Sequence, residues 1–580
     1  MKTIYSASSQ TCSPFIAAPT GLLIVILFAC GAQTGVADET ASFPVVIHVD
    51  AAQSLGELKP VWRFFGADEP NYAYMKDGRK LLAELGELRP GQVYFRTHNL
   101  LTSGDGTPAL KWGSTGAYKQ DADGKPVYDW EITDRIFATY LERGVHPYVE
   151  IGFMPKDLST HPDPYQHHWS PQKRYEEIFT GWAYPPTDYD KWEELVYEWT
   201  KHCVEKFGRD EVERWYWEVW NESNIPYWKG SPAEFRRLHD YAIAGVRRAL
   251  PTAKVGGPDA AGDGGQFTRD FFQHCLHEKN DATGQLGTPL DFVSFHAKGK
   301  PEFVGGHVRM GVADELRTVD AGFKLIASFP ELKNTPIVIG ECDPDTCAAC
   351  QGPQLGYRND PLYASYTAAS FARILELARQ DHVNLDGILT WAFEFEDQPY
   401  FAGFRVLVTN GIDLPVLNVF RMFAKMSGSG VVVTSDGAVP LDTMLAHGVR
   451  EHADVSAIAS LDRDGVFVLV WHYHEEDLPG PEADVSLALD HLPIKDGQVT
   501  LEQFQVDAEH SNPVAAWRKM GEPQSPTPAQ LAELQHTGQL AQAETPPTLN
   551  VADFSLKYQF ALPRQSVALV HVTWTHKASD

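Results

Sequence analysis

The stretch Trp217-Glu218-Val219-Trp220-Asn221-Glu222 is an apolar run of β type that ends in an amide followed by a carboxyl group. Similar runs come before and after it, and amphipathic helical segments lie between them. One such segment, Pro232–Leu250, carries apolar residues at helical spacing and is followed by Pro251, which ends the pattern. Runs of β type that alternate with amphipathic helices predict a parallel α/β fold.

The chain contains eight candidate strands of this kind. They are Val61–Gly66, Gln92–His98, His146–Gly152, Arg214–Trp220, Lys254–Gly257, Asp291–His296, Pro336–Glu341 and Gly387–Phe393. Eight consecutive βα units predict a (β/α)8 TIM barrel, in which the active site lies at the carboxyl ends of the strands. We assign residues 59–428 to this catalytic barrel.

The pattern changes near Gly430 to short alternating strands that polar turns separate, as in Gly465–Trp471. This pattern is typical of a β-sandwich, and a stretch rich in proline, glutamine and alanine at residues 521–547 interrupts it. We therefore expect a C-terminal β-sandwich domain at residues 429–580. The early run Val45–Val49, within residues 38–58, is expected to join this sandwich before the chain enters the barrel.

The amino-terminal region resembles an export signal. An apolar run from Phe15 to Cys30 follows Lys2 and is short for a membrane span. This predicts a signal peptide over residues 1–37, with either peptidase cleavage after Ala37 or lipidation of Cys30. Simple secretion is favoured because Phe28 fits the lipoprotein pattern poorly, and an uncleaved anchor is the alternative. We expect a secreted or periplasmic protein that contacts a membrane only if Cys30 is lipidated.

Composition and charge narrow the partners. The formal net charge of −28 at pH 7 argues against a nucleic-acid partner, because phosphate neutralisation needs a basic surface. The 15 Trp, 22 Tyr and 30 Phe residues suggest exposed rings that stack on a flat ligand such as a sugar. We expect an oligosaccharide or polysaccharide partner, and the oligomeric state stays open.

Three of the seven cysteines, Cys342, Cys347 and Cys350, lie within nine residues after a predicted strand. Three thiols make an incomplete zinc site, which would need a fourth ligand such as a histidine of residues 161–168. In an exported protein a disulfide within the trio is favoured over a metal. We expect no metal and no other cofactor.

Two strands of the predicted barrel end in carboxyl groups. Glu222 follows strand four, where nearby aromatic rings can raise its pKa enough for proton donation, and Asn221 can bind a sugar hydroxyl. Taken alone, Glu222 could equally cap a helix. Glu341 ends strand seven, which faces strand four across the barrel mouth, and this favours a catalytic pair. A separation of about 5 Å would suit retention through a covalent intermediate, and a wider gap would suit inversion.

Over nearly all of the mature chain, these residues resemble glycoside hydrolase family 39, which includes β-xylosidases and α-L-iduronidase. The motifs that carry the resemblance are Arg96-Thr97-His98, Pro147–Pro155, Trp220-Asn221-Glu222, Val255-Gly256-Gly257-Pro258, Ser294-Phe295-His296 and Glu341. The resemblance implies retention, with Glu222 as general acid/base and Glu341 as nucleophile. It also implies that His98, Asn221 and His296 bind the sugar in the cleaved subsite.

Departures from the xylosidase pattern point toward the iduronidase branch. Ser223 replaces the usual proline after the acid/base, and Lys298, Asp397 and Arg405 resemble residues that surround the uronate in that branch. α-L-Iduronides and β-D-xylosides share their configuration at C1 to C4, so one catalytic pair can serve both. A sugar carboxylate would need Lys298 or Arg405 as its charge partner. The alternative is a structural ion pair of Arg405 with Asp397 or Glu394.

Aromatic residues complete the expected pocket. Phe153 and Trp391 end barrel strands and are expected to form its hydrophobic wall, although barrel-core packing would explain either one. The insertion Leu158–Trp192 is expected to overhang the entrance and make an exo-acting pocket, or to form an oligomer contact. The function expected is an exo-acting retaining glycosidase that accepts a β-D-xyloside or an α-L-iduronide, with a slight preference for the iduronide. A plain xylosidase and a non-catalytic carbohydrate-binding protein are the alternatives.

Overall fold

The structure is a computed structural model that describes residues 41–172, 174–544 and 548–575. The predicted signal peptide and Cys30 lie outside these residues. Across the described part of the chain, none of the helices has the length and apolar character needed to span a membrane.

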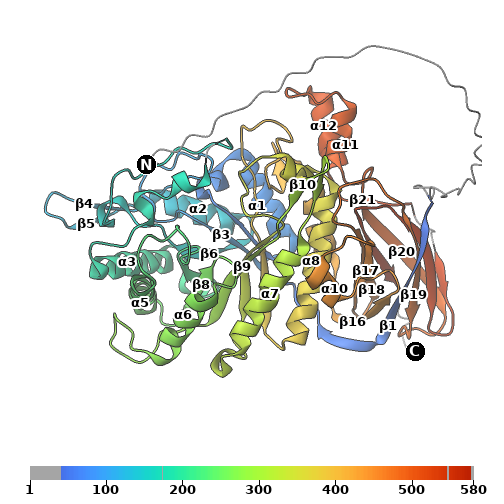
Figure 1. The fold of residues 1–580 in the computed structure, drawn as a ribbon, viewed down its shortest axis with the longest axis horizontal. Helices are drawn as coiled ribbons and strands as arrows, with labels where there is room; N and C mark the ends of the chain where they lie inside the picture. Colours follow the sequence, from blue (N-terminus) through green and yellow to red (C-terminus); the bar gives the residue numbers. More distant parts are fainter. Residues whose placement is uncertain (1–40, 173, 545–547, 576–580) are drawn as a thin grey trace, which may run out of the picture. The chain divides into compact units, whose positions relative to one another are not determined.

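Eight parallel strands close into a barrel (Figure 1), as the alternation of strand and helix predicts. In chain order they are β2 (Phe64–Ala67), β3 (Val93–Thr97), β6 (Val145–Ile151), β7 (Tyr216–Val219), β8 (Lys254–Ala260), β9 (Phe292–Lys298), β12 (Ile337–Asp343) and β13 (Leu385–Thr390). All eight predicted strands are therefore confirmed. Strand β13 pairs with both β12 and β2, so the sheet has no free edge.

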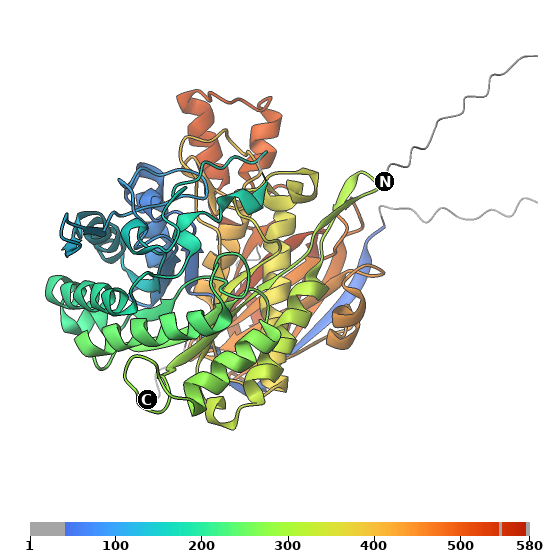
Figure 2. The ribbon, with the colours of Figure 1, turned by 60° about the vertical axis from the view of Figure 1, so that its left-hand side comes forward.

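Helices cover the outside of this barrel, and the green helices of the middle of the chain are seen against the strands in Figure 2. They are α1 (Lys76–Leu88), α2 (Glu131–Glu142), α3 (Tyr189–Phe207), α4 (Arg209–Val212), α5 (Pro232–Ala249), α6 (Gly265–His277), α7 (Val312–Ala327), α8 (Pro361–Gln380) and α9 (Pro415–Lys425). Helix α5 shows why the sequence begins a helix there. Ser231 and Glu234 form a reciprocal capping box, and Pro232 occupies the first turn, where its missing N–H is not needed.

Alternation along the barrel strands stacks three layers of side chains inside the barrel. The lowest layer is aromatic, and Tyr94 of β3 and Tyr148 of β6 each lie about 5 Å from the ring of Tyr216 of β7. Two residues further along β3, Arg96 lies in a charged layer. Two residues beyond that, His98 lies at the strand end. Toward the carboxyl ends of the strands, the barrel interior therefore changes from packed aromatic rings to charged side chains and then to the candidate site.

The second domain is one ten-stranded mixed sheet. Its strands are β1 (Phe43–Glu57), β16 (Ser429–Ser435), β17 (Asp454–Leu461), β18 (Gly465–Tyr473), β19 (Ala483–Asp490), β20 (Gly497–Val506), β21 (Ala541–Gln542), β22 (Leu549–Val551), β23 (Leu556–Leu562) and β24 (Ser566–Thr573). Strand β1 pairs with β16 on one side and β19 on the other. Apolar residues of strands far apart in the sheet, including Val468 and Leu487, share one core. The sheet therefore folds over itself as the predicted β-sandwich.

Strand β18 joins the two domains, because every residue in it is buried. Val468 and Val470 belong to the core of the sandwich, whereas Leu469 and Trp471 belong to the core of the barrel side. Helices α8 and α9 pack against this second face. The uninterrupted apolar run Val466–Trp471 is the sequence signal of a strand that is covered on both faces.

Short hairpins and helices lie between the main elements. They are the hairpins β4 (Tyr118–Gln120) with β5 (Pro126–Tyr128), β10 (Glu302–Val304) with β11 (His307–Arg309) and β14 (Val408–Thr409) with β15 (Ile412–Asp413), and the helices α10 (Leu441–His447), α11 (Pro513–Lys519) and α12 (Pro528–Thr537). Helix α12 occupies the stretch rich in proline, glutamine and alanine. A second capping box, between Thr527 and Gln530, begins it.

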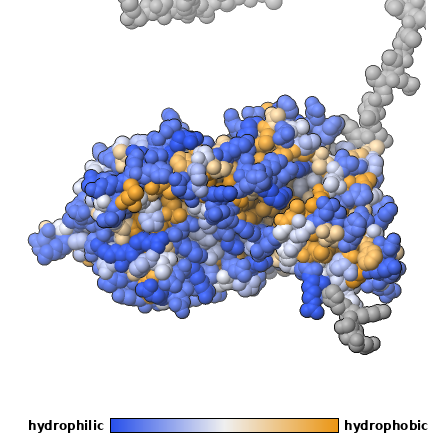
Figure 3. Space-filling model, turned by 90° about the horizontal axis from the view of Figure 1, so that it is seen from below, coloured by the Kyte–Doolittle hydropathy of each residue, from blue (hydrophilic) through white to orange (hydrophobic). Residues whose placement is uncertain are grey.

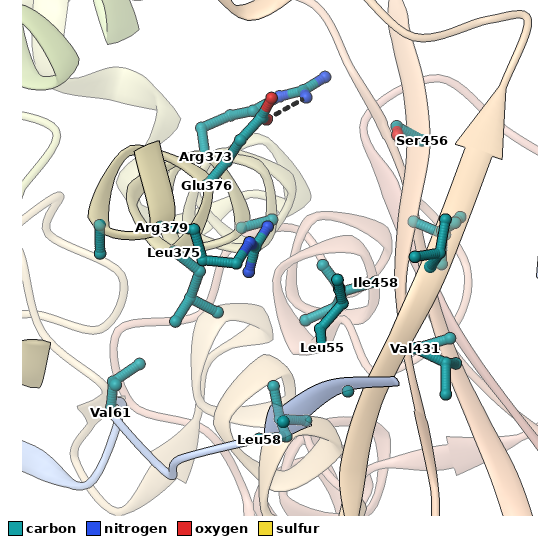
Figure 4. A pocket seen from close by; sticks show the side chains of 18 of the residues that line it. Leu55, Leu58, Val61, Arg373, Leu375, Glu376, Arg379, Val431, Ser456 and Ile458 are labelled. Carbon is teal, nitrogen blue, oxygen red and sulfur yellow. Dashed lines mark hydrogen bonds and ion pairs between the residues drawn. The ribbon is translucent and has the colours of Figure 1, made fainter. Parts of the chain in front are cut away.

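A groove of about 790 Å³ lies between α8 and the sheet. Figure 4 shows Leu375 and Arg379 of α8 on one side and Val431 and Ile458 of the sheet on the other. Hydrophilic side chains cover most of the face seen in Figure 3, and apolar side chains gather there in several patches.

The contact between the two domains predicts a large stability effect at Leu469, which is fully buried. Leu469→Ala should lower the free energy of unfolding by about 2–5 kcal/mol, because it removes apolar contacts and leaves a cavity. Urea unfolding measures this change. The matched control is Leu478→Ala, since the Leu478 side chain is 44% exposed. Equal losses in the two variants would contradict the role of β18 as the joining strand.

Candidate active site

A buried arginine organises the middle layer of the barrel. The guanidinium of Arg96 lies 2.8 Å from a carboxyl oxygen of Glu150 and 2.9 Å from one of Glu218, and it also contacts Asp259 at hydrogen-bond distance. Burial raises the pKa of Glu150 to about 7 and of Glu218 to about 8, although Arg96 opposes both shifts. Four strands therefore meet at one cation beneath the barrel mouth.

Glu222 lies above this layer, three residues after the end of β7. Its backbone has a φ of 44°, in the left-handed region, and its N–H donates to the carbonyl of Asp259 on the neighbouring strand. A non-glycine residue is held in this conformation only when its surroundings fix it. Glu222 does not cap the next long helix, since Ser231 caps α5. The Glu222 side chain is 17% exposed.

Glu341 lies on β12, three strands away from β7 around the barrel, with its side chain 8% exposed. Gly340 precedes it because a Cβ at that position would overlap the carboxylate of Asp259. Burial raises the pKa of Glu341, but the charges of Lys298, His296 and His98 outweigh this and hold it well below its usual range. An ionised carboxylate of this kind suits a nucleophile.

His296 of β9 lies between the two carboxyl groups. Its Nδ1 is 3.1 Å from Oε1 of Glu222 and 3.8 Å from Oε1 of Glu341, and its Nε2 is 2.8 Å from Asp259. Burial disfavours the imidazolium, but the charges of Asp259 and Glu341 prevail and raise the pKa of His296 to about 10. The two Oε1 atoms are therefore at most about 7 Å apart, a bound that admits the short separation of a retaining enzyme.

His98 of β3 approaches Glu341 from another side. Its Nε2 is 3.6 Å from Oε1 of Glu341, and its Nδ1 is 3.2 Å from Asp68. Burial opposes its charge, but Glu150 and Asp68 raise the pKa of His98 to about 9. The rings of Trp391 and Phe153 lie 4.4 and 5.5 Å from the His98 ring. Both predicted wall residues are buried, and the structure brings them to the site.

Asn221 offers a hydrogen-bond donor. Its Oδ1 accepts from Arg96 at 3.2 Å, which fixes the orientation of the amide. Its Nδ2 is buried and has no hydrogen-bond partner among residues 41–172, 174–544 and 548–575. A buried amide donor without a partner is costly unless a ligand or water satisfies it. A sugar hydroxyl is a ligand of the required kind.

Lys298, at the end of β9, is the cation nearest Glu341. Its Nζ lies 2.7 Å from Oε2 of Glu341 and 2.5 Å from Oδ2 of Asp343. The side chain is 11% exposed. Burial disfavours the charge, but Asp343 and Glu341 outweigh it and raise the pKa of Lys298. Lys298 therefore pairs with Glu341 whether or not it also meets a substrate carboxylate.

Arg405 does not form the expected ion pair with Asp397 or Glu394. Its side chain is only 1% exposed, and its guanidinium lies 2.7 Å from Asp345 and 3.4 Å from Asp343. Its Nε donates to the carbonyl of Trp391. Protein acceptors therefore surround Arg405, and its contact with a sugar stays a prediction.

Asp397 does not join the catalytic residues. The chain turns outward there with a φ of 59°, and the side chain lines a separate groove with Tyr74, Lys80 and Tyr400. Its exposed position follows from this turn. Asp397 follows the eighth barrel strand, β13, closely in the sequence, but this does not place its side chain beside the two catalytic candidates.

The cysteine trio separates into two kinds. Cys347 and Cys350 form a disulfide, as predicted for an exported protein. Cys342 is a buried thiol that donates to Glu315. Among the described residues, no three His, Cys, Asp or Glu side chains are arranged to hold a metal ion.

The insertion at residues 158–192 reaches the site through aromatic contacts. Tyr175 shares a 2.5 Å hydrogen bond with Tyr227, whose ring lies 5.9 Å from His98. Trp182 packs 4.4 Å from the ring of Phe153. The insertion therefore narrows one side of the barrel mouth.

Sequence reasoning missed the charged residues that support the pair. Glu150 and Glu218 carried a usable signal, because each is a carboxyl group inside an apolar strand. Asp259 and Asp345 were not found, since their roles depend on partners distant in the sequence. Together the site places an ionised carboxylate opposite a second carboxyl, in a setting able to transfer a glycosyl group.

Comparison with known proteins agrees with this chemistry. The family model for glycosyl hydrolases family 39 matches residues 45–551. A β-xylosidase of Geobacillus stearothermophilus is 26% identical over 81% of this chain and 85% of its own length. An α-L-iduronidase of Mus musculus is also 26% identical, over 92% of this chain and 81% of its own length.

Solved structures share the fold. A bacterial orthologue of human α-L-iduronidase has a TM-score of 0.71 at 19% identity, covering 92% of this chain and 84% of its own. The family 39 enzyme of Xanthomonas axonopodis pv. citri has a TM-score of 0.69 at 21% identity, covering 93% of this chain and 99% of its own. The family model spans most of the chain, so the protein belongs to glycosyl hydrolases family 39 and is a glycoside hydrolase.

Proposed function

We propose that the protein is a retaining, exo-acting glycosidase that releases a terminal sugar with the configuration shared by β-D-xylosides and α-L-iduronides. The observation that carries this proposal is the position of His296, which lies within 4 Å of both carboxyl groups. The aromatic contacts of the 158–192 insertion support exo action. The signal-peptide pattern and the Cys347–Cys350 disulfide support export to an oxidising compartment.

The reaction takes two steps. The carboxylate of Glu341 attacks C1 while Glu222 donates its proton to the departing glycosidic oxygen, which gives a covalent glycosyl-enzyme. Water then attacks C1, Glu222 accepts its proton, and the bond to Glu341 breaks. His296 is protonated at neutral pH and donates from Nδ1 to Glu222, so it holds the acid/base in place.

An uncharged terminal sugar of the β-D-xyloside type is the better-supported substrate. Lys298 already pairs with Glu341 and Asp343, and Arg405 already pairs with Asp343 and Asp345. A uronate would add another buried anion beside two cations that already have carboxylate partners. This revises the slight preference for an iduronide drawn from the motifs. The iduronide is the second candidate, because Lys298 retains partial exposure beside the nucleophile.

The roles of the two carboxyl groups predict opposite rescue products. Glu341→Ala should abolish nearly all turnover of an aryl glycoside, and added azide should give a glycosyl azide of inverted configuration. Glu222→Ala should still be glycosylated by substrates with good leaving groups, and azide should then give the retained configuration. NMR of the isolated products measures this. Exchanged stereochemistry would exchange the two roles.

The charge balance predicts that wild-type kcat/KM is higher for an aryl β-D-xyloside than for an aryl α-L-iduronide. Lys298→Met should then lower both values by similar factors, because it removes the cation beside Glu341 for either substrate. Lys324→Met serves as the matched control, since the Lys324 side chain lies on α7 and is 62% exposed.

The iduronide candidate predicts the reverse. The wild-type protein would prefer the iduronide, and Lys298→Met would cost that substrate about 2–5 kcal/mol more transition-state binding than the xyloside, because a buried carboxylate would lose its only cation. Steady-state kinetics with both aryl glycosides separates the two outcomes.

A further inference from the structure

The loop that follows the nucleophile strand is built around Arg358. Its guanidinium donates to the carbonyls of Cys347 and Cys350, both at 2.6 Å, and to that of Ala348 at 3.2 Å. The disulfide between Cys347 and Cys350 closes the turn that aims these carbonyls at one point. The Arg358 side chain is fully buried. The loop is therefore a preformed acceptor shell around a cation.

This shell is connected to the nucleophile by alternating charges. One carboxyl oxygen of Asp345 accepts from Arg358 at 2.6 Å and from Arg405 at 2.7 Å. Arg405 and Lys298 then share one oxygen of Asp343, at 3.4 and 2.5 Å. From there Lys298 reaches Glu341 at 2.7 Å.

We propose that the Cys347–Cys350 disulfide positions Lys298 at the nucleophile through this chain of ion pairs, so that full activity requires the oxidised loop. The proposal rests on the proposed role of Glu341. Asp345, Arg358 and Arg405 are positioning residues, because each acts on Glu341 only through a neighbour. The backbone N–H of Arg405 also donates to the carbonyl of Ala348, which ties the loop to the strand-eight segment.

Loss of the crosslink should loosen the shell for a physical reason. Without it the carbonyls of the loop lose their common orientation, and Arg358 must recover its hydrogen bonds elsewhere. Asp345 then loses its fixed position between Arg358 and Arg405. As Arg405 moves, the Asp343 oxygen that it shares with Lys298 also changes position. A weaker contact between Lys298 and Glu341 removes part of the charge that keeps the nucleophile ionised.

A small dithiol can open the loop, since Cys350 is partly exposed. The S–S bond accepts two electrons and two protons to give two thiols, and the dithiol closes to its own disulfide. The dithiol therefore supplies all the electrons and protons that the reduction needs.

The test compares Cys347→Ala/Cys350→Ala with the wild type on an aryl glycoside over a full pH range. We expect kcat/KM to fall about tenfold or more. We also expect the acidic limb of the pH profile to move to higher pH, because the nucleophile then loses its proton only at higher pH. The groups that face Glu341 and contribute to this limb are Arg96, His98, Glu150, His296 and Lys298.

The matched control is Cys203→Ala/Cys275→Ala, which removes two buried free thiols of α3 and α6. It should leave the acidic limb unchanged. If the loop variant does not fold, reduction and alkylation of the wild-type protein gives the same comparison, with circular dichroism to confirm a folded chain. A fall in kcat/KM with an unmoved acidic limb, or no change in either, would overturn the proposal. A wild type inactive on every aryl glycoside would instead refute the proposed function.

Discussion

The site depends on the ion pairs between the buried guanidinium of Arg96 and the carboxyl groups around it. Carboxyl groups of β6, β7, β8 and β12 surround it, and the Arg96 side chain itself is fully buried. A cation buried in this way is tolerated only because these partners compensate for lost hydration, and removing one partner typically costs about 3–5 kcal/mol. The same cation contacts Asp259, which binds His296, and it also bonds Asn221, the residue before Glu222.

This arrangement follows from the period of a β-strand. Tyr94, Arg96 and His98 are spaced by two along one strand, so they point into one barrel at three heights. One stretch of chain therefore supplies a core ring, the buried cation and a side chain of the candidate site. A shift of that strand by one residue would remove all three side chains from the interior together, which makes the register of the barrel a condition for catalysis.

Local pattern was enough to predict the eight strands, because apolar runs and helical periodicity are set by neighbours in the sequence. Glu222 and Glu341 were also predictable, since each follows an apolar run at a position where the barrel geometry is known. Arg405 was not, because its partners Asp343 and Asp345 are fixed by a loop about sixty residues away. The position of Asp397 was not predictable either, because its own left-handed backbone turns the chain away from the site.

The place of β1 in the sheet has a consequence for biosynthesis. Ile47 lies between Ser435 and Leu487, so the first described strand must wait for two partners made some four hundred residues later. A nascent chain therefore holds an unpaired, half-apolar strand until both partners have been made, and such edges invite aggregation. Completion of the sheet is a late, non-local step that follows synthesis of the whole barrel.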